Sequence, residues 1–214
     1  MPESLTLNAL PLFPLGTVLY PGGVLPLRIF EVRYLDMIGK CRKHGAPFGV
    51  VALNQGAEVQ RPQGDAFADE SFDSVGTLAS IQEYSAPQPG LMVVRCSGTQ
   101  RFRVTRRERL KHGLWVADVE QFAQDQLLQI PPDLQPVADA LGRLIKVLQE
   151  RGVPADQMPM DTPYLLGDCG WVANRWCELL SAPLQLKQRL MALDNPLLRL
   201  ELVSDLLERA GVTK

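Results

Sequence analysis

The sequence predicts an α+β protein: a β-rich N-terminal part with one helix, followed by a C-terminal helical bundle. Two observations support this fold class. Up to about residue 123, short apolar runs alternate with Gly and Pro, a pattern typical of short strands in a small, partly open barrel. From Ile130 onward, apolar residues recur at three- and four-residue steps, the period of amphipathic helices. We therefore expect a barrel-like part over residues 1–123 and a helical part over residues 124–214.

The opening block, residues 10–53, contains Pro14, Pro21 and Pro26 among apolar residues. Proline lacks a backbone donor and has a restricted φ, so each proline marks a strand edge or a turn. This block is therefore expected to form short extended pieces joined by tight turns.

The one helix of the N-terminal part is predicted over residues 31–44. Its apolar residues, Tyr34, Ile38 and Cys41, have helical spacing, and Gly45 is placed to end it.

The strands predicted after this helix cover residues 48–53, 75–84, 91–104 and the alternating stretch from Trp115 to Glu120. We expect the 91–104 segment to be two pieces, split at Ser97-Gly98 by a turn or bulge. Residues 54–74 are rich in Gly, Gln, Asp and Glu, and are expected to form a long exposed loop.

Four helices are predicted in the C-terminal part. The first starts at Pro132 and ends at Gly152, and the second stops before Pro183. The third carries Leu186, Leu190 and Leu193, and the fourth runs from Asn195-Pro196 to about Ala210.

Composition indicates an ordinary globular protein. The chain has 214 residues, 46% of them hydrophobic, and a formal net charge of −2, which argues against a protein-wide attraction to nucleic acid or acidic membranes. The N-terminal residues lack the pattern of a signal peptide, and no apolar run is long enough to span a membrane. We therefore expect a cytoplasmic protein with four reduced cysteines.

Several blocks match, in order, those of one known family: residues 10–15 (LPLFPL), 20–22, 25–31, 33–34, 48–51, 75–79, 98–102, 186–190 and 199–200. On these residues the chain resembles the N-terminal substrate-binding domain of the ATP-dependent protease Lon, which also occurs as a stand-alone protein. The resemblance implies a PUA-like barrel, a kind also used in RNA-modifying proteins.

Catalytic motifs are missing from the sequence. Gly39-Lys40 is followed by Cys41, and Tyr34 stands where a phosphate-binding loop needs its first Gly. We therefore expect no ATPase or peptidase activity, no cofactor and no catalytic residue. Cys41 and His44 have a two-ligand spacing without a second pair, so no metal site is expected.

A basic ridge is the strongest charge feature of the chain. Six Arg or Lys residues between positions 101 and 112 stand against one Glu: Arg101, Arg103, Arg106, Arg107, Arg109 and Lys111. They could bind phosphates of RNA, with Trp115 available for stacking. The simpler interpretation is the solvated face of an edge strand, because Phe102 and Val104 alternate with Arg101 and Arg103.

The favoured function is non-catalytic recognition of polypeptides that are unfolded or carry a degradation signal, for delivery to a protease or in competition with Lon. The resemblance implies this partner class. The expected mechanism is apolar burial in a groove between the two parts, with β-pairing at an exposed strand edge. The candidate groove residues are Phe13, Tyr20, Phe30, Tyr34, Tyr164, Trp171 and Trp176. RNA binding by the ridge and small-molecule binding in the groove are the alternatives, and the oligomeric state stays open.

Overall fold

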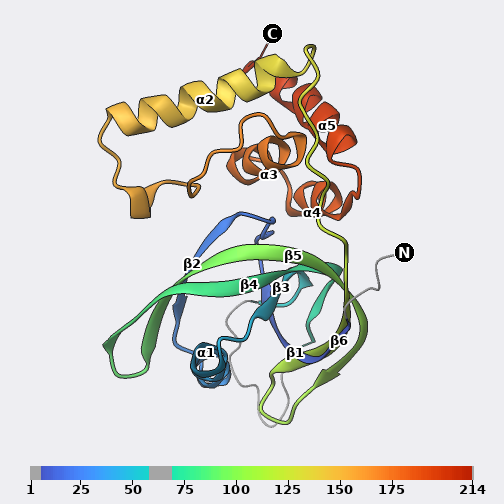
Figure 1. Ribbon diagram of the computed structural model, residues 1–214. Coiled ribbons are helices and arrows are strands. Elements are labelled where there is room, and N and C mark those ends of the chain that lie inside the picture. Colours follow the sequence, from blue (N-terminus) through green and yellow to red (C-terminus); the bar gives the residue numbers. More distant parts are fainter. Residues whose placement is uncertain (1–5, 58–68, 214) are drawn as a thin grey trace. The chain divides into compact units, whose positions relative to one another are not determined.

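The computed structural model describes residues 6–57 and 69–213 (Figure 1). The chain divides into two compact units, Met1–Gln124 and Asp125–Lys214.

The N-terminal unit is a six-stranded sheet with one helix. Its elements are β1 (Thr6–Leu15), β2 (Val24–Ile29), α1 (Val32–His44), β3 (Phe48–Gln55), β4 (Ser71–Gln88), β5 (Leu91–Arg109) and β6 (Trp115–Gln121). The strand order is β2-β5-β4-β3-β1-β6, and β6 also pairs with β5. This last pairing closes β5, β4, β3, β1 and β6 into a ring, with β2 attached outside it to β5. The pairing supports the predicted barrel-like fold.

Strand β5 is the longest strand and departs from the prediction. Residues 91–104 are one continuous strand, not two pieces, although the register with β4 shifts between Thr77 and Ala79, opposite Arg101 and Gly98. The predicted split into two strands was wrong, but the bulge or irregularity predicted at Ser97-Gly98 is present in the register between Gly98 and Arg101. Gly98 also lies against the backbone of Tyr20. A Cβ on Gly98 would lie 2.2 Å from the carbonyl oxygen of Tyr20, so only glycine allows this close backbone approach.

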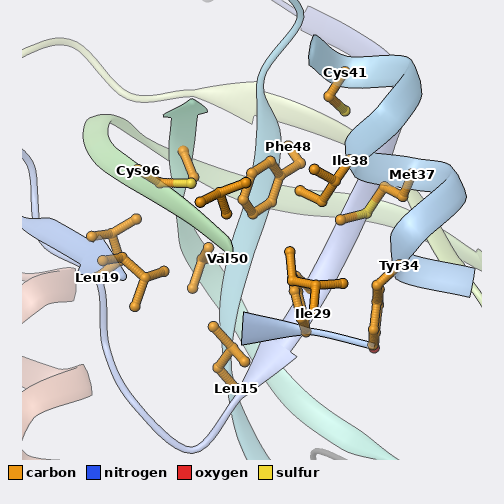
Figure 2. Packing of buried hydrophobic residues seen from close by; sticks show 14 of the residues in the cluster. Leu15, Leu19, Ile29, Tyr34, Met37, Ile38, Cys41, Phe48, Val50 and Cys96 are labelled. Carbon is orange, nitrogen blue, oxygen red and sulfur yellow. The ribbon is translucent and has the colours of Figure 1, made fainter. Parts of the chain in front are cut away.

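Helix α1 confirms the prediction for residues 31–44. It ends at Gly45, whose φ of 61° places it in the left-handed region. Tyr34, Met37, Ile38 and Cys41 are buried, and Figure 2 shows them packed with residues of the strands and loops. The partners labelled there are Leu15, Leu19, Ile29, Phe48, Val50 and Cys96. Burial of one helical stripe against the sheet thus forms the main core of this unit.

The predicted loop over residues 54–74 is shorter than expected at both ends. Strand β3 continues to Gln55 and β4 begins at Ser71, with Leu53 opposite Phe72. Phe72 is buried in a second core cluster with Leu12, Leu78 and Phe102, and this burial stabilises strand structure in a polar stretch of sequence. The rest of the predicted loop, residues 58–68, lies outside the described residues.

The C-terminal unit is helical, as predicted. It contains α2 (Gln135–Glu150), a short 3-10 helix (Ala155–Gln157), α3 (Cys169–Leu179), α4 (Leu184–Ala192) and α5 (Pro196–Arg209). Helix α2 begins at Gln135 rather than at Pro132. Helix α5 begins as predicted, because the Asn195 side chain accepts hydrogen bonds from the backbone N–H groups of Leu197 and Leu198. Helix α3 contacts α2, α4 and α5; that the helices form a bundle stays a prediction.

No helix within residues 6–57 and 69–213 is both long enough and apolar enough to cross a membrane.

Candidate functional site: an apolar pocket at strand β2

The N-terminal unit has a pocket of about 190 Å³ between the end of β1, strand β2 and the start of α1. Its lining is mostly apolar: Phe13, Leu15, Pro26, Leu27, Arg28, Ile29, Phe30, Glu31 and Tyr34. An apolar cavity of about 150 Å³ holds a benzene ring. The pocket therefore has room for one large apolar side chain.

The rim of this pocket exposes apolar surface. Phe30, which lines the pocket, is 53% exposed, whereas the neighbouring Val32, which is 80% exposed, does not line it. Phe30 lies in the short connection from β2 to α1, and Val32 is the first residue of α1. Glu31 is the N-cap residue, and its carbonyl accepts hydrogen bonds from the N–H groups of Tyr34 and Leu35. Because α1 begins only two residues after Phe30, Phe30 belongs neither to β2 nor to α1 and lies beside the pocket.

Two stacked rings form part of the pocket wall. The centroids of Phe13 and Tyr34 lie 3.9 Å apart, with an angle of 20° between the ring planes. Burial raises the pKa of Tyr34 above its ordinary value, so the phenol stays neutral at physiological pH. The part of the wall that Phe13 and Tyr34 form therefore carries no charge and suits an apolar ligand.

A buried ion network lies behind the pocket. Arg33 is 6% exposed and donates to the carbonyl of Gly113 (2.9 Å) and, through Nε, to Glu31 (3.2 Å). Its Nη2 atom lies 3.6 Å from the Glu70 carboxylate, which also accepts a hydrogen bond from Trp115 Nε1 at 2.7 Å. Glu70 had been predicted to lie in an exposed loop, and this is wrong. Because Arg33 pairs with Glu31, it neutralises the one carboxylate in the pocket lining.

The structure brings together three of the seven aromatic candidates. Phe13, Phe30 and Tyr34 line the pocket. Tyr20 is completely buried and does not line it.

The other three aromatic candidates lie in the C-terminal unit. Tyr164 and Trp171 have ring centroids 6.3 Å apart. Trp176 is buried and donates a hydrogen bond from Nε1 to the carbonyl of Val137, 3.0 Å away. That all seven residues line one groove between the two parts stays a prediction.

The basic ridge is less exposed than its sequence suggests. Arg101 is 4% exposed and lies over the Phe122 ring, so the prediction of a solvated position is wrong for this residue. Arg109 lies 3.7 Å from the buried Glu70 carboxylate. A register shift between Val104 and Arg106 moves Arg107 opposite Ala117, and its guanidinium lies over the rings of Phe72 and Trp115. The exposed cations of the ridge are Arg103, Arg106, Arg107 and Lys111.

The sequence patterns do not predict that β2 contributes to the pocket. Pro26 by itself indicates only a strand edge or a turn, and residues 27–29 are part of a matching block. One sequence pattern nevertheless indicates this strand. Pro26 lies within an apolar run, and Phe30 follows it just before a helix, which is typical of an edge strand that ends in an exposed aromatic residue. The sequence does not show that β1 provides the opposite wall.

Comparison with known proteins identifies the family. Residues 9–209 match the family described as the ATP-dependent protease La (LON) substrate-binding domain, and the chain belongs to this family. The predicted resemblance is confirmed. The comparison with curated proteins found no significant match.

Two solved structures have the same fold. A crystal structure of a Lon N-terminal domain protein from Xanthomonas campestris is 30% identical, with a TM-score of 0.73, and the match covers 93% of this chain and 98% of that one. The N-terminal domain of a Lon protease from the Mycobacterium avium complex is 14% identical, with a TM-score of 0.57, and the match covers 92% of this chain and 97% of that one. The second likeness concerns the fold alone.

Proposed function

We propose that this protein recognises polypeptides without catalysis, by binding an apolar side chain of an unfolded or signal-bearing segment in the β2 pocket. The observation that carries this proposal is the exposed Phe30 at the rim of a mostly apolar pocket. Membership of a substrate-binding domain family supports the polypeptide class of ligand. Concave sites with a mostly apolar lining and a few polar groups are the usual places where proteins bind ligands.

The energetics favour broad and weak recognition. Burying one large apolar side chain contributes about 1.5–3 kcal/mol. A single pocket of this size therefore selects segments that are already unfolded and expose such a side chain, rather than one unique sequence. Delivery of these clients to a protease, or competition with Lon for them, are the two roles that this affinity would serve.

The test is a titration against a fluorescently labelled unfolded polypeptide, followed by anisotropy. Phe30→Ser removes the aromatic rim, and we expect it to weaken binding about tenfold, because it removes apolar surface that would be buried by the ligand. Val32→Ser is the matched control, since Val32 is the more exposed residue but does not line the pocket. We expect this control to bind like the unaltered protein.

Salt dependence separates this function from RNA binding by the ridge. Contacts from the four exposed cations of the ridge to phosphates would reduce affinity about 10²-fold between 50 and 200 mM salt. Burial of an apolar side chain predicts little change over that range. Equal affinities of the Phe30→Ser and Val32→Ser variants, or a steep salt dependence, would contradict the proposal.

A further inference from the structure

Strand β2 has a free edge. Among the described residues it pairs with β5 alone, with Val24 opposite Ser97 and Ile29 opposite Met92 in an unbroken antiparallel register. The adjoining pair, Gly23 and Gly98, is joined by a hydrogen bond from the Gly98 N–H to the Gly23 carbonyl. Hydrogen-bonded and non-hydrogen-bonded pairs alternate along an antiparallel ladder. Residues 25, 27 and 29 therefore bond to β5, and the backbone groups of Val24, Pro26 and Arg28 point to the free edge.

Pro26 fits this assignment, because a proline without an N–H is tolerated where the N–H would face away from the ladder. Pro26 and Arg28 are exposed, and Val24 is half-buried. The free edge thus offers the carbonyls of all three residues and the N–H groups of Val24 and Arg28.

The apolar pocket lies at this same edge. It is lined by residues from both faces of β2, Pro26 and Arg28 on one face and Leu27 and Ile29 on the other. Its far wall is Phe13 and Leu15, which belong to the part of β1 beyond Leu12, where the pairing of β1 with β6 ends. A segment that pairs with the edge of β2 would therefore carry its side chains over the pocket.

Arg28 supplies a charge at this edge. It is exposed, lines the pocket and forms no ion pair with another described residue. The nearby Glu31 is already paired with Arg33. The pocket rim therefore has an excess positive charge, which complements an acidic side chain on the bound segment.

We infer that β2 binds an extended client segment as an additional strand, with one apolar side chain in the pocket and an acidic side chain beside Arg28. The inference rests on the proposed function and specifies how the polypeptide is held. Main-chain hydrogen bonds to the edge supply sequence-independent affinity, and the pocket and Arg28 supply the preference for an apolar residue next to an acidic one. Such recognition suits a protein with many unfolded clients, because every extended chain has the same backbone groups.

The first test is a backbone N-methylation scan of a labelled peptide with a central Leu and an adjacent Glu. Strand pairing predicts that methylation weakens binding at alternate positions, by about tenfold for each hydrogen bond lost, and is tolerated at the positions between. Helical binding, or binding through the Leu side chain alone, would not produce this two-residue period and would overturn the inference.

The second test changes the protein at the edge. Arg28→Pro removes the outward N–H of Arg28, and Arg28→Ala is the control that removes the charge but keeps this donor. We expect Arg28→Ala to weaken binding by about fivefold at most, because this corresponds to the free energy of one cross-strand charge pair. We expect Arg28→Pro to weaken binding further, because it also removes the hydrogen-bond donor. Equal affinities of the two variants, with both folded by circular dichroism, would overturn the inference. If the proline variant does not fold, the methylation scan on the unaltered protein shows whether the peptide binds as an additional strand.

Failure of the inference can be told apart from failure of the proposed function. If the peptide binds, Phe30→Ser weakens it and no two-residue period appears, the pocket recognises polypeptide but the edge does not. If Phe30→Ser has no effect, the proposed function fails and the inference fails with it.

Discussion

At the scale of single residues, Arg199 is the main polar connection of the C-terminal unit. It is 1% exposed and lies on α5. Its guanidinium donates to the carbonyls of Leu190 (3.0 Å) and Leu193, and to the side chains of Asn174 (3.0 Å) and Asp125 (2.7 Å). The guanidinium of Arg199 thus connects α5 by hydrogen bonds to α3, to the end of α4 and to Asp125 at the start of this unit.

We expect Arg199→Ala to lower the free energy of unfolding by about 3–5 kcal/mol, because it removes one partner of a buried ion pair. Arg199→Lys should also destabilise the protein, since an ammonium cannot reproduce the fixed geometry of the guanidinium donors. Urea denaturation measures both changes. Arg209→Ala, an exposed position at the end of the same helix, is the control and should stay within about 0.5 kcal/mol of the unaltered protein. A mild effect of Arg199→Ala would show that the network is not needed for stability.

At the scale of elements, β5 holds the N-terminal unit together, because it pairs with β2, β4 and β6. Gly98 is where the 20–23 turn meets this strand. The Gly22 N–H donates to the Gly98 carbonyl, and the Gly98 N–H donates to Gly23. The pocket depends on this contact indirectly, because it sets the register of β2 on β5.

We expect Gly98→Ala to destabilise the protein by about 3 kcal/mol, because its Cβ would overlap the carbonyl oxygen of Tyr20, which is held in place by a hydrogen bond from the Gly23 N–H. Gly39→Ala is the matched control. Gly39 lies within α1 with nothing within 4 Å of an added Cβ, so alanine there should stabilise the helix by about 0.5–1 kcal/mol. Thermal and urea unfolding should therefore show shifts of opposite sign. A neutral Gly98→Ala variant would mean that the 20–23 turn can move away.

At the scale of the whole molecule, the core of the N-terminal unit contains acidic groups that are neutral in the folded state. Burial, and secondarily the nearby Cys41, raises the pKa of Cys96 from 9.0 to about 12. Burial also raises the pKa of Cys41 and of Tyr34. In the unfolded chain these groups ionise at their ordinary values, so alkaline pH favours unfolding.

We expect the contribution of Cys96 to stability to be constant below about pH 8 and to fall as the pH rises from 9 toward 12, because over this range the thiol ionises in the unfolded chain but stays neutral in the folded protein. The loss from Cys96 alone should be about 1–2 kcal/mol near pH 10. Urea denaturation across this range measures it. Cys96→Ala should be less stable at neutral pH but should lose less stability on alkalinisation. An unchanged pH slope in that variant would contradict the assignment.

Much of the fold could be predicted from local patterns. The helix over residues 31–44 follows from three apolar residues at helical spacing and from Gly45, all within a few positions of one another. The start of α5 follows in the same way from Asn195 and Pro196. The site was predicted in part, because Phe13, Phe30 and Tyr34 line the pocket while Tyr20 does not.

Local sequence patterns were sufficient to predict a β-rich part followed by helices, the family, and the place of Pro26 at an edge or turn. These depend on residue spacing and backbone chemistry within short segments. Only the tertiary structure decided the closure of the sheet by β6, the burial of Arg101, and the burial of Glu70 beside Arg33 and Trp115. The physical reason is that whether a charged side chain is solvated or buried depends on partners far away in the chain, and no local pattern contains them.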